Sequence, residues 1–274
     1  MDPRTIPANG RVVAATHVAD FPNLRPVEPT SMRVTAAVAN LLSDPAGPRE
    51  RQLLSGSSFE ALETRDGYVF GSAPALGGYV GWIAMGDLAT QSEPNHFVCA
   101  RQSHAYPEPD FKTREVTALP HLAGVHVAEF SGRFARTEFG WVPSAHLRDH
   151  APDDPVAIAE LFIGAPYLWG GNSIWGLDCS GLVHAALTAT GHACPGDADQ
   201  QEQQVGRFLS DRDTVQRGDL YFWKGHVAMA VDGDTLIHAN AHAMAVTLEP
   251  IDAAISRISA QGDGPVTSRK RFLE

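Results

Sequence analysis

Apolar and polar positions in residues 1–150 alternate in short runs that Gly, Pro, Asp and Ser interrupt. FEALE at 59–63 has the alternation of a half-buried strand, and RDG at 65–67 is a turn sequence. The later run AGVHVAEFSGRFARTEFG at 123–140 has the same texture. Runs of this length between turn residues predict a region built almost entirely from strands.

A weak internal repeat divides this strand-rich region. GWIAMGDL at 81–88 and GWVPSAHL at 140–147 share the pattern G-W-[IV]-x-x-x-x-L and begin 59 residues apart. This period is about the length of a small five-strand barrel, and Trp82 and Trp141 could each fill an interior that has little other core. The predicted organisation is, in order, an extension at 1–30, a first small β-barrel at 31–90 and a second at 91–150.

The texture changes after RDHAPDDP at 148–155, a polar junction that contains prolines. Helical patterns come first in the remainder, and HVAMAVDGDTLIHAN at 226–240 then predicts two strands around an Asp-Gly turn. This order predicts an α+β domain at 151–274. The other predicted elements are a helix from Asp154 to about Gly164–Pro166, a helix at 179–191, a polar loop at 195–204 and a closing helix at 251–261.

Composition and charge narrow the function classes. A formal net charge of −11, with 43% apolar and 19% charged residues, describes a soluble protein and disfavours binding to nucleic acid. Cys99, Cys179 and Cys194 form no CxxC pair, so we expect a reducing compartment. No window reaches the ~18 apolar residues of a membrane span, and the start MDPRTIPANGRVV lacks a signal-peptide core. We therefore expect a cytoplasmic protein without membrane or nucleic-acid partners, unless a leader has been removed; no pattern predicts its oligomeric state.

One cysteine lies where a nucleophile would be useful. Cys179 in GLDCSGLVHAALTATGH begins a predicted helix, and the N-terminus of a helix stabilises a thiolate. A cysteine nucleophile also needs a base and a group that orients the base. His226 begins one predicted strand and His238 ends the next, and antiparallel pairing brings the two close. The second imidazole could accept the ring N–H of His226 and fix its tautomer.

Simpler interpretations of these residues remain open. Most buried cysteines behave as small inert apolar side chains, and a histidine at a strand end is often only a polar cap. His184 and His192 lie on or just beyond the helix of Cys179, where neither suits a base from a separate element. A zinc site built from the same residues would lack a second cysteine or a carboxylate at ligand spacing, so no metal is expected.

The segments PYLWGGNSIWGLDCSGLV, GDLYFW…GHVAMAV and LIHAN resemble the NlpC/P60 cysteine peptidases of bacterial peptidoglycan. The resemblance covers about 150–274 and implies a papain-like catalytic domain in which Cys179, His226 and His238 form the triad. It also implies that Tyr167 helps the Cys179 backbone N–H to hold the oxyanion, although Tyr167 could instead be a packed aromatic residue. The GW pattern of the first half resembles the bacterial SH3-like domains that commonly accompany such enzymes.

This arrangement, without a recognisable signal peptide, resembles the γ-D-glutamyl-L-diamino acid endopeptidases of cell-wall recycling. Those enzymes cleave the small murein peptide L-Ala-γ-D-Glu-diaminopimelate after γ-D-Glu, and the resemblance implies no cofactor. Asp178 and Ser180 match residues that bind the free amino end of the peptide, although Asp178 could also cap the helix. Glu50 and Tyr79 match residues of the first barrel that bind the L-Ala ammonium, although Glu50 could equally be a solvated charge.

Two positions depart from the family pattern, and other functions stay open. The loop that often reads P-R-D-[SA] is PGDA at 195–198, which keeps Asp197 but loses an arginine that could bind an anion. The third triad position varies among relatives, so Asn240 and His242 are alternatives to His238. The rival functions are a D,L-endopeptidase acting on polymeric peptidoglycan, a peptide-binding module with a degenerate active site, and a related acyl transferase or amidase.

Overall fold

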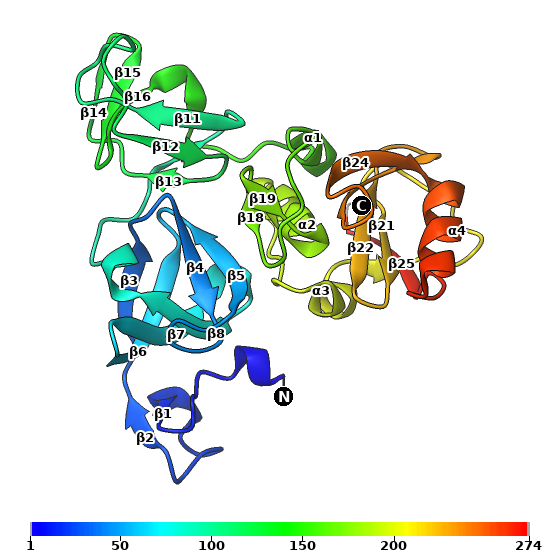
Figure 1. Ribbon diagram of the computed structural model, residues 1–274, viewed down its shortest axis with the longest axis horizontal. Coiled ribbons are helices and arrows are strands. Elements are labelled where there is room, and N and C mark those ends of the chain that lie inside the picture. Colours follow the sequence, from blue (N-terminus) through cyan, green and yellow to red (C-terminus); the bar gives the residue numbers. More distant parts are fainter. Residues whose placement is uncertain (1, 273–274) are drawn as a thin grey trace. The chain divides into compact units, whose positions relative to one another are not determined.

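The computed structural model describes residues 2–272, and the chain divides into two compact units, Met1–His150 and Ala151–Glu274. Strands dominate the first unit, whereas the second combines helices with a sheet (Figure 1). The chain is therefore α+β. Within residues 2–272, every helix longer than three residues lies in the second unit. None of these helices is long and apolar enough to cross a bilayer.

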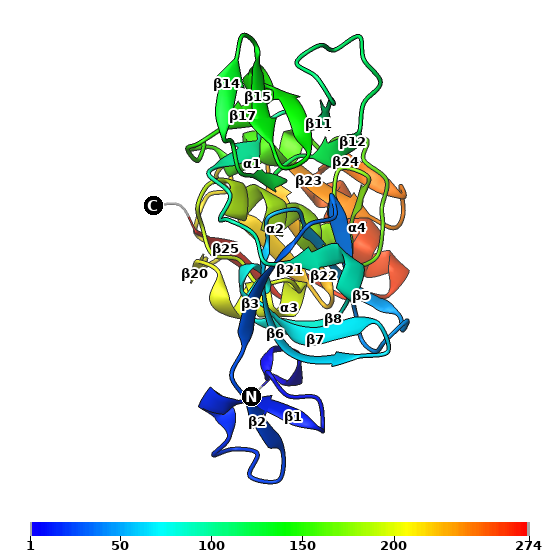
Figure 2. The same ribbon diagram turned by 90° about the vertical axis from the view of Figure 1, so that its left-hand side faces the viewer.

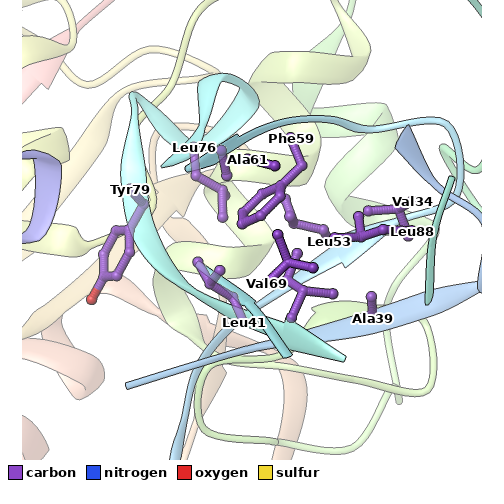
Figure 3. Close-up of a cluster of buried hydrophobic side chains, with 12 residues drawn as sticks. Val34, Ala39, Leu41, Leu53, Phe59, Ala61, Val69, Leu76, Tyr79 and Leu88 are labelled. Atoms are coloured by element: carbon purple, nitrogen blue, oxygen red, sulfur yellow. The ribbon is translucent and has the colours of Figure 1, made fainter. Parts of the chain in front are cut away.

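A seven-stranded antiparallel sheet forms the larger part of the first unit. Its strand order is β5-β4-β8-β7-β6-β3-β9, and Figure 2 shows β6, β7 and β8 side by side. Leu41, Phe59 and Leu76 belong to the apolar cluster at its centre (Figure 3). The strands are β3 (Thr30–Val34), β4 (Val38–Leu42), β5 (Arg49–Leu54), β6 (Ser58–Arg65), β7 (Tyr68–Ala73), β8 (Tyr79–Ala84) and β9 (Leu88–Ala89).

Trp82 does not fill this core, contrary to the prediction from the GW repeat. Alternate residues of β8 face opposite sides of the sheet, so Ile83 enters the core and Trp82 faces away from it. Trp82 is nevertheless only 3% exposed, because it packs with Phe70 and with Val12 of the N-terminal extension. The extension, whose strands β1 (Val12–Ala14) and β2 (Arg25–Val27) pair in parallel, thus packs on the first sheet.

Residues 96–148 form three small sheets around a second apolar cluster that includes Val98 and Val142. Trp141 is half-buried and lies outside this cluster, so the prediction that it fills a core is also wrong. Its neighbour Gly140 has a φ of 117°, and a Cβ there would lie 2.5 Å from the carbonyl oxygen of Tyr106, which explains the glycine of the repeat. The strands are β10 (His96–Val98), β11 (Gln102–Ala105), β12 (Thr117–Pro120), β13 (Gly124–Val125), β14 (Glu129–Ser131), β15 (Phe134–Thr137), β16 (Gly140–Pro143) and β17 (Leu147–Arg148), and the 3-10 helices of the unit are Pro3–Thr5, Ala15–His17, Pro74–Leu76, Met85–Asp87 and Ser144–His146.

The second unit is built on a six-stranded antiparallel sheet in the order β20-β25-β21-β22-β23-β24. Helix α2 packs against β22 and β23, and α4 lies on the other side of these strands (Figure 1). Alternate residues such as Trp223, Ala228 and Leu236 pack with Ile251 and Ala254 of α4. The strands are β18 (Asn172–Ser173), β19 (Gly176–Leu177), β20 (Arg207–Phe208), β21 (Leu220–Trp223), β22 (His226–Ala230), β23 (Thr235–Asn240), β24 (Ala245–Pro250) and β25 (Ser268–Arg271), and the helices are α1 (Pro155–Glu160), α2 (Cys179–Ala189), α3 (Ala198–Gln204) and α4 (Ile251–Gln261).

The polar segment 195–204 is not the loop that its composition predicted, because most of it is helix α3. Asp197 accepts a hydrogen bond from the backbone of Gln200, whose side chain accepts one from the backbone N–H of Asp197. This reciprocal capping nucleates a short helix in a sequence without an apolar stripe. Gln201 then donates to the backbone carbonyl oxygens of Ser180 and Pro195 at 2.9 and 3.0 Å, which ties α3 to the start of α2.

Candidate active site

Cys179 is the first residue of α2, as its position in the sequence predicted. The helix begins there because the Asp178 carboxylate accepts the backbone N–H of Gly181 at 2.7 Å and serves as the N-cap. Cys179 is 6% exposed, and its Sγ lies 3.9 Å from the backbone carbonyl oxygen of Gly225. A thiolate at this position would be stabilised by the N-terminal end of the helix dipole.

Asp178 and Ser180, predicted to bind the peptide, are engaged in holding the nucleophile loop. Both are buried, at 3% and 2% exposure. Besides capping α2, Asp178 accepts the backbone N–H of Gly170 at 2.9 Å and the Ser180 hydroxyl at 3.2 Å. The capping interpretation thus has direct structural support, and substrate binding by these two residues stays a prediction.

The structure brings the two predicted histidines together. His226 begins β22 after the two-residue turn Lys224–Gly225, in which Gly225 has a φ of 79°, a value that favours glycine. His238 lies within β23 rather than at its end, and it is 0% exposed. The Nε2 atom of His226 lies 3.0 Å from Nδ1 of His238, so the rings share a hydrogen bond across the hairpin.

A carboxylate that the sequence analysis missed lies behind His238. Glu249 on β24 has Oε2 at 3.0 Å from Nε2 of His238. Arg257 on α4 donates to both oxygens of Glu249, from Nε at 2.9 Å and from Nη2 at 2.6 Å. The signal that could have revealed Glu249 is the need of a buried imidazole for a second partner, together with the strand that follows LIHAN.

Burial of the two histidines determines their protonation states. It lowers the pKa of His226 to about 3, helped by the nearby charge of His238, and that of His238 to about 4. The Glu249 carboxylate opposes both shifts without cancelling them. The hydrogen bond from Arg257 holds the pKa of Glu249 below its usual value. At neutral pH the site therefore contains two neutral imidazoles beside an ionised carboxylate.

The predicted nucleophile and the predicted base both line a cavity of about 160 Å³. Cys179, His226 and Tyr167 all line it, and Tyr167 is half-buried with its backbone N–H bound to Met244. Tyr167 and Cys179 line the same cavity, and the oxyanion role of Tyr167 stays a prediction. The other lining residues are Lys224, Gly225, Asn240, Ala241, His242, Arg257, Ile258, Gln261 and Asp263.

The two alternatives for the third triad position have other partners. Asn240 donates to Thr247 at 2.9 Å and accepts the backbone N–H of Ala243 at 2.8 Å, so it shapes the turn between β23 and β24. Gln261 lies 3.3 Å from Nδ1 of His242. His238 is therefore the residue that is hydrogen-bonded to His226.

Glu50 and Tyr79, predicted to bind the L-Ala ammonium, belong to the first unit. Glu50 lies half-buried on β5, and Tyr79 on β8 is 4% exposed within the apolar cluster (Figure 3). Their substrate role stays a prediction. Across residues 2–272, no group of three or more His, Cys, Asp or Glu side chains is placed to hold a metal ion.

A sequence model described as the NlpC/P60 family matches residues 164–259. The γ-D-glutamyl-L-lysine dipeptidyl-peptidase of Bacillus subtilis (strain 168) is 31% identical over 184 residues, which cover 59% of this chain and 60% of that protein. The protein of the same name from Bacillus cereus (strain ATCC 10987 / NRS 248) is 33% identical over 110 residues, covering 37% of this chain and 32% of that one. The chain thus spans less than two thirds of the length of these curated relatives.

A solved structure shares the fold over most of the chain. It is an NlpC/P60 family protein from Bacillus cereus ATCC 10987, which superimposes with a TM-score of 0.75 at 19% identity. The match covers 89% of this chain and 100% of that one, so the likeness of fold extends beyond residues 164–259.

Proposed function

We propose that this chain, whose residues 164–259 belong to the NlpC/P60 family, is a cysteine peptidase that hydrolyses the γ-D-Glu–diamino acid bond of small murein peptides with a free N-terminal L-Ala. The observation that carries the proposal is the hydrogen bond between His226 and His238 beside a cavity that contains Cys179. The names of the two bacterial relatives, γ-D-glutamyl-L-lysine dipeptidyl-peptidases, support the bond specificity.

The proposed reaction begins when the neutral His226 takes the thiol proton of Cys179. The sulfur then attacks the carbonyl carbon of the D-Glu γ-carboxyl group, and the Cys179 N–H and the Tyr167 hydroxyl donate to the oxyanion that forms. His226 returns the proton to the leaving amine as the C–N bond breaks, which leaves a thioester on Cys179. Water hydrolyses the thioester, releases L-Ala-γ-D-Glu and restores the thiol.

Charges around the cavity suit a leaving diamino acid. Lys224 and Asp263 both line the cavity, and neither side chain makes a hydrogen bond or ion pair with any other residue of the described range. Lys224 lies two residues before His226, the donor to the leaving amine, so we place it on the leaving-group side. An ammonium and a carboxylate there would complement the carboxylate and the terminal amine of a diamino acid.

Three further parts of the proposal concern the rest of the protein. Residues 31–90 and 91–150 would be SH3-like barrels, and Glu50 and Tyr79 would bind the L-Ala ammonium. The protein would act in the cytoplasm, which agrees with the presence of all three cysteines as thiols. Glu50→Ala should then raise KM for the peptide with a free N-terminus and so weaken the preference for it over the N-acetylated peptide.

The test compares three substrates by mass spectrometry: free L-Ala-γ-D-Glu-diaminopimelate, its N-acetylated form and intact sacculi. Release of L-Ala-γ-D-Glu from the free tripeptide alone would support the proposal, with Cys179→Ala as the inactive control. Cleavage of sacculi would instead favour an endopeptidase that acts on polymeric peptidoglycan. A relative from Mycobacterium tuberculosis that is 29% identical over 137 residues is named a peptidoglycan endopeptidase. Tight binding of the tripeptide without turnover would favour a binding module.

A further inference from the structure

The hydrogen-bonded chain behind the nucleophile does not end at His238. It continues to Glu249 at 3.0 Å and from there to Arg257, which holds both carboxylate oxygens. We propose that Glu249, anchored by Arg257, is a positioning residue that fixes which ring nitrogen carries the proton in His238 and, through it, in His226. The catalytic consequence rests on the proposed function, whereas the proton positions do not.

Hydrogen-bond donors and acceptors must alternate along the series His226, His238 and Glu249. An ionised carboxylate only accepts hydrogen bonds, and each neutral imidazole has one donor nitrogen and one acceptor nitrogen. The Glu249 carboxylate therefore requires the His238 proton on Nε2, which leaves Nδ1 of His238 as an acceptor. Since Nδ1 of His238 faces Nε2 of His226 at 3.0 Å, His226 must donate from Nε2. The lone pair of His226 is then on Nδ1, where it can receive the thiol proton.

The assignment requires that both rings are neutral and that Glu249 is charged. Four elements pack on β23, namely α2, β22, β24 and α4, and each contributes a titratable or charged side chain to the surroundings of the two histidines. Burial keeps the two rings neutral above about pH 5, and Arg257 keeps Glu249 ionised. These groups are Cys179 on α2, His226 on β22, Glu249 on β24 and Arg257 on α4.

Arg257 holds the Glu249 carboxylate in a defined orientation. The planar guanidinium of Arg257 binds both oxygens of Glu249, and Arg257 also donates to Gln261 at 2.8 Å one helical turn further on. The side chains of Arg257 and Glu249 are 18% and 20% exposed, so water competes little for the pair. Helix α4 thereby fixes the orientation of a carboxylate that lies on the neighbouring strand.

A merely structural ion pair between α4 and β24 is the alternative to be excluded. The informative change is Glu249→Leu, which removes the acceptor and keeps the bulk, beside Glu249→Gln, whose side-chain carbonyl can still accept from Nε2 of His238. Arg217→Leu is the matched control, because it removes a comparable arginine–carboxylate pair with Asp154 in the same unit, away from the residues that line the cavity.

The measurement is the ¹⁵N spectrum of the imidazole groups at pH 7, which reports directly which nitrogen is protonated. His226→Gln and His238→Gln variants assign the two rings. In the wild type we expect protons on Nε2 of both rings, in Glu249→Leu a mixture of tautomers, and in Glu249→Gln and Arg217→Leu the wild-type pattern. A proton on Nδ1 of His238 in the wild type, or an unchanged pattern in folded Glu249→Leu, would overturn the proposal. If Glu249→Leu does not fold, the wild-type spectrum still decides.

Kinetics supply the second readout. Glu249→Leu should lower kcat roughly 10- to 100-fold with little change in KM, and Glu249→Gln should recover most of that loss. A loss of thermal stability with kcat unchanged would mean that the pair is only structural. Because the spectra need no peptide, wild-type tautomers as proposed in a protein that cleaves none of the peptides would support this inference and contradict the proposed function.

Discussion

Two buried histidines, one in each unit, show what separates a structural histidine from a candidate catalytic one. His121 is 1% exposed, and its Nδ1 lies 3.0 Å from the backbone carbonyl oxygen of Ala100. His238 is 0% exposed, but its ring nitrogens face His226 and Glu249. Burial lowers the pKa of both His121 and His238 to about 4. Neither burial nor pKa distinguishes the two rings; what differs is that titratable side chains connect His238 to a cavity.

A cysteine of the first unit and one of the second, Cys99 and Cys179, show the same distinction. The Sγ atoms of Cys99 and Cys179 each lie near one backbone carbonyl oxygen, at 3.8 Å from Ala145 and 3.9 Å from Gly225. Only Cys179 begins a helix and lines a cavity together with a histidine. The setting of the sulfur, rather than its nearest contact, therefore makes Cys179 the candidate nucleophile.

The largest effect should come from removing the thiol that has this setting. Cys179→Ala should lower peptide turnover by roughly 10⁴-fold or more and leave the thermal midpoint nearly unchanged, because only a small side chain is lost. Cys194→Ala is the matched control, since Cys194 is also buried in the second unit but does not line the cavity. Like Cys179→Ala it should change the thermal midpoint little, but it should leave kcat intact. Turnover that survives in Cys179→Ala would show that the nucleophile is misassigned.

The comparison of the histidines predicts opposite outcomes for the same substitution. His238→Ala should lower kcat by roughly 10³-fold, because His226 loses the partner that orients it. His121→Ala should leave kcat unchanged, although both variants should lose about 1–3 kcal/mol of stability from the broken packing and hydrogen bonds. Steady-state kinetics and thermal melts of both variants provide the check. Equal losses of kcat would erase the distinction drawn between the two units.

A smaller effect is expected from the hydroxyl of Tyr167. Tyr167→Phe removes one proposed donor to the oxyanion and keeps the ring, so kcat should fall roughly 10- to 100-fold with KM little changed. Tyr221→Phe, a buried tyrosine of the same unit outside the cavity, is the control and should keep its kcat. If Tyr167→Phe retains full kcat, Tyr167 is a packed aromatic residue only.

The last prediction concerns the dependence of stability on pH, to which buried histidines of both units should contribute. The unfolded histidines take up protons near pH 6.5, whereas His121 and His238 in the folded protein do so near pH 4. Stability should therefore fall as the pH drops from about 6.5 to 4, by up to about 1.4 kcal/mol per pH unit for each such histidine. Denaturant melts across this range should show a shallower slope for His121→Gln than for the wild type. An identical slope would mean that His121 titrates normally when folded.

The sequence predicted those parts of the site that depend on local patterns. The helix after Asp178 and the hairpin that joins His226 to His238 follow from a cap and an Asp-Gly turn, and both are observed. Glu249 could not be predicted in the same way, because its partner Arg257 acts through the packing of α4 on the sheet. A glutamate in an alternating strand resembles a solvent-facing residue until that packing is known.

The wrong predictions, one in each unit, have a related cause. Trp82 was expected inside a barrel because a small barrel needs a large core residue, but residues of the distant N-terminal extension supply its partner instead. The polar segment 195–204 has no apolar periodicity, which predicts a loop, yet the side chains of Asp197 and Gln200 cap it as a helix. In both cases long-range packing or side-chain capping overrode the local pattern.

The most direct test of the central claim is to trap the thioester on Cys179. The protein is mixed with L-Ala-γ-D-Glu-diaminopimelate, quenched in acid within the first turnover and digested with a protease. The mass of the peptide that contains residue 179 is then measured by mass spectrometry. We expect that peptide to gain the mass of L-Ala-γ-D-Glu less one water, and we expect Cys179→Ala to show neither adduct nor product. Turnover of the tripeptide with the adduct on another residue, or undiminished turnover by Cys179→Ala, would contradict the account.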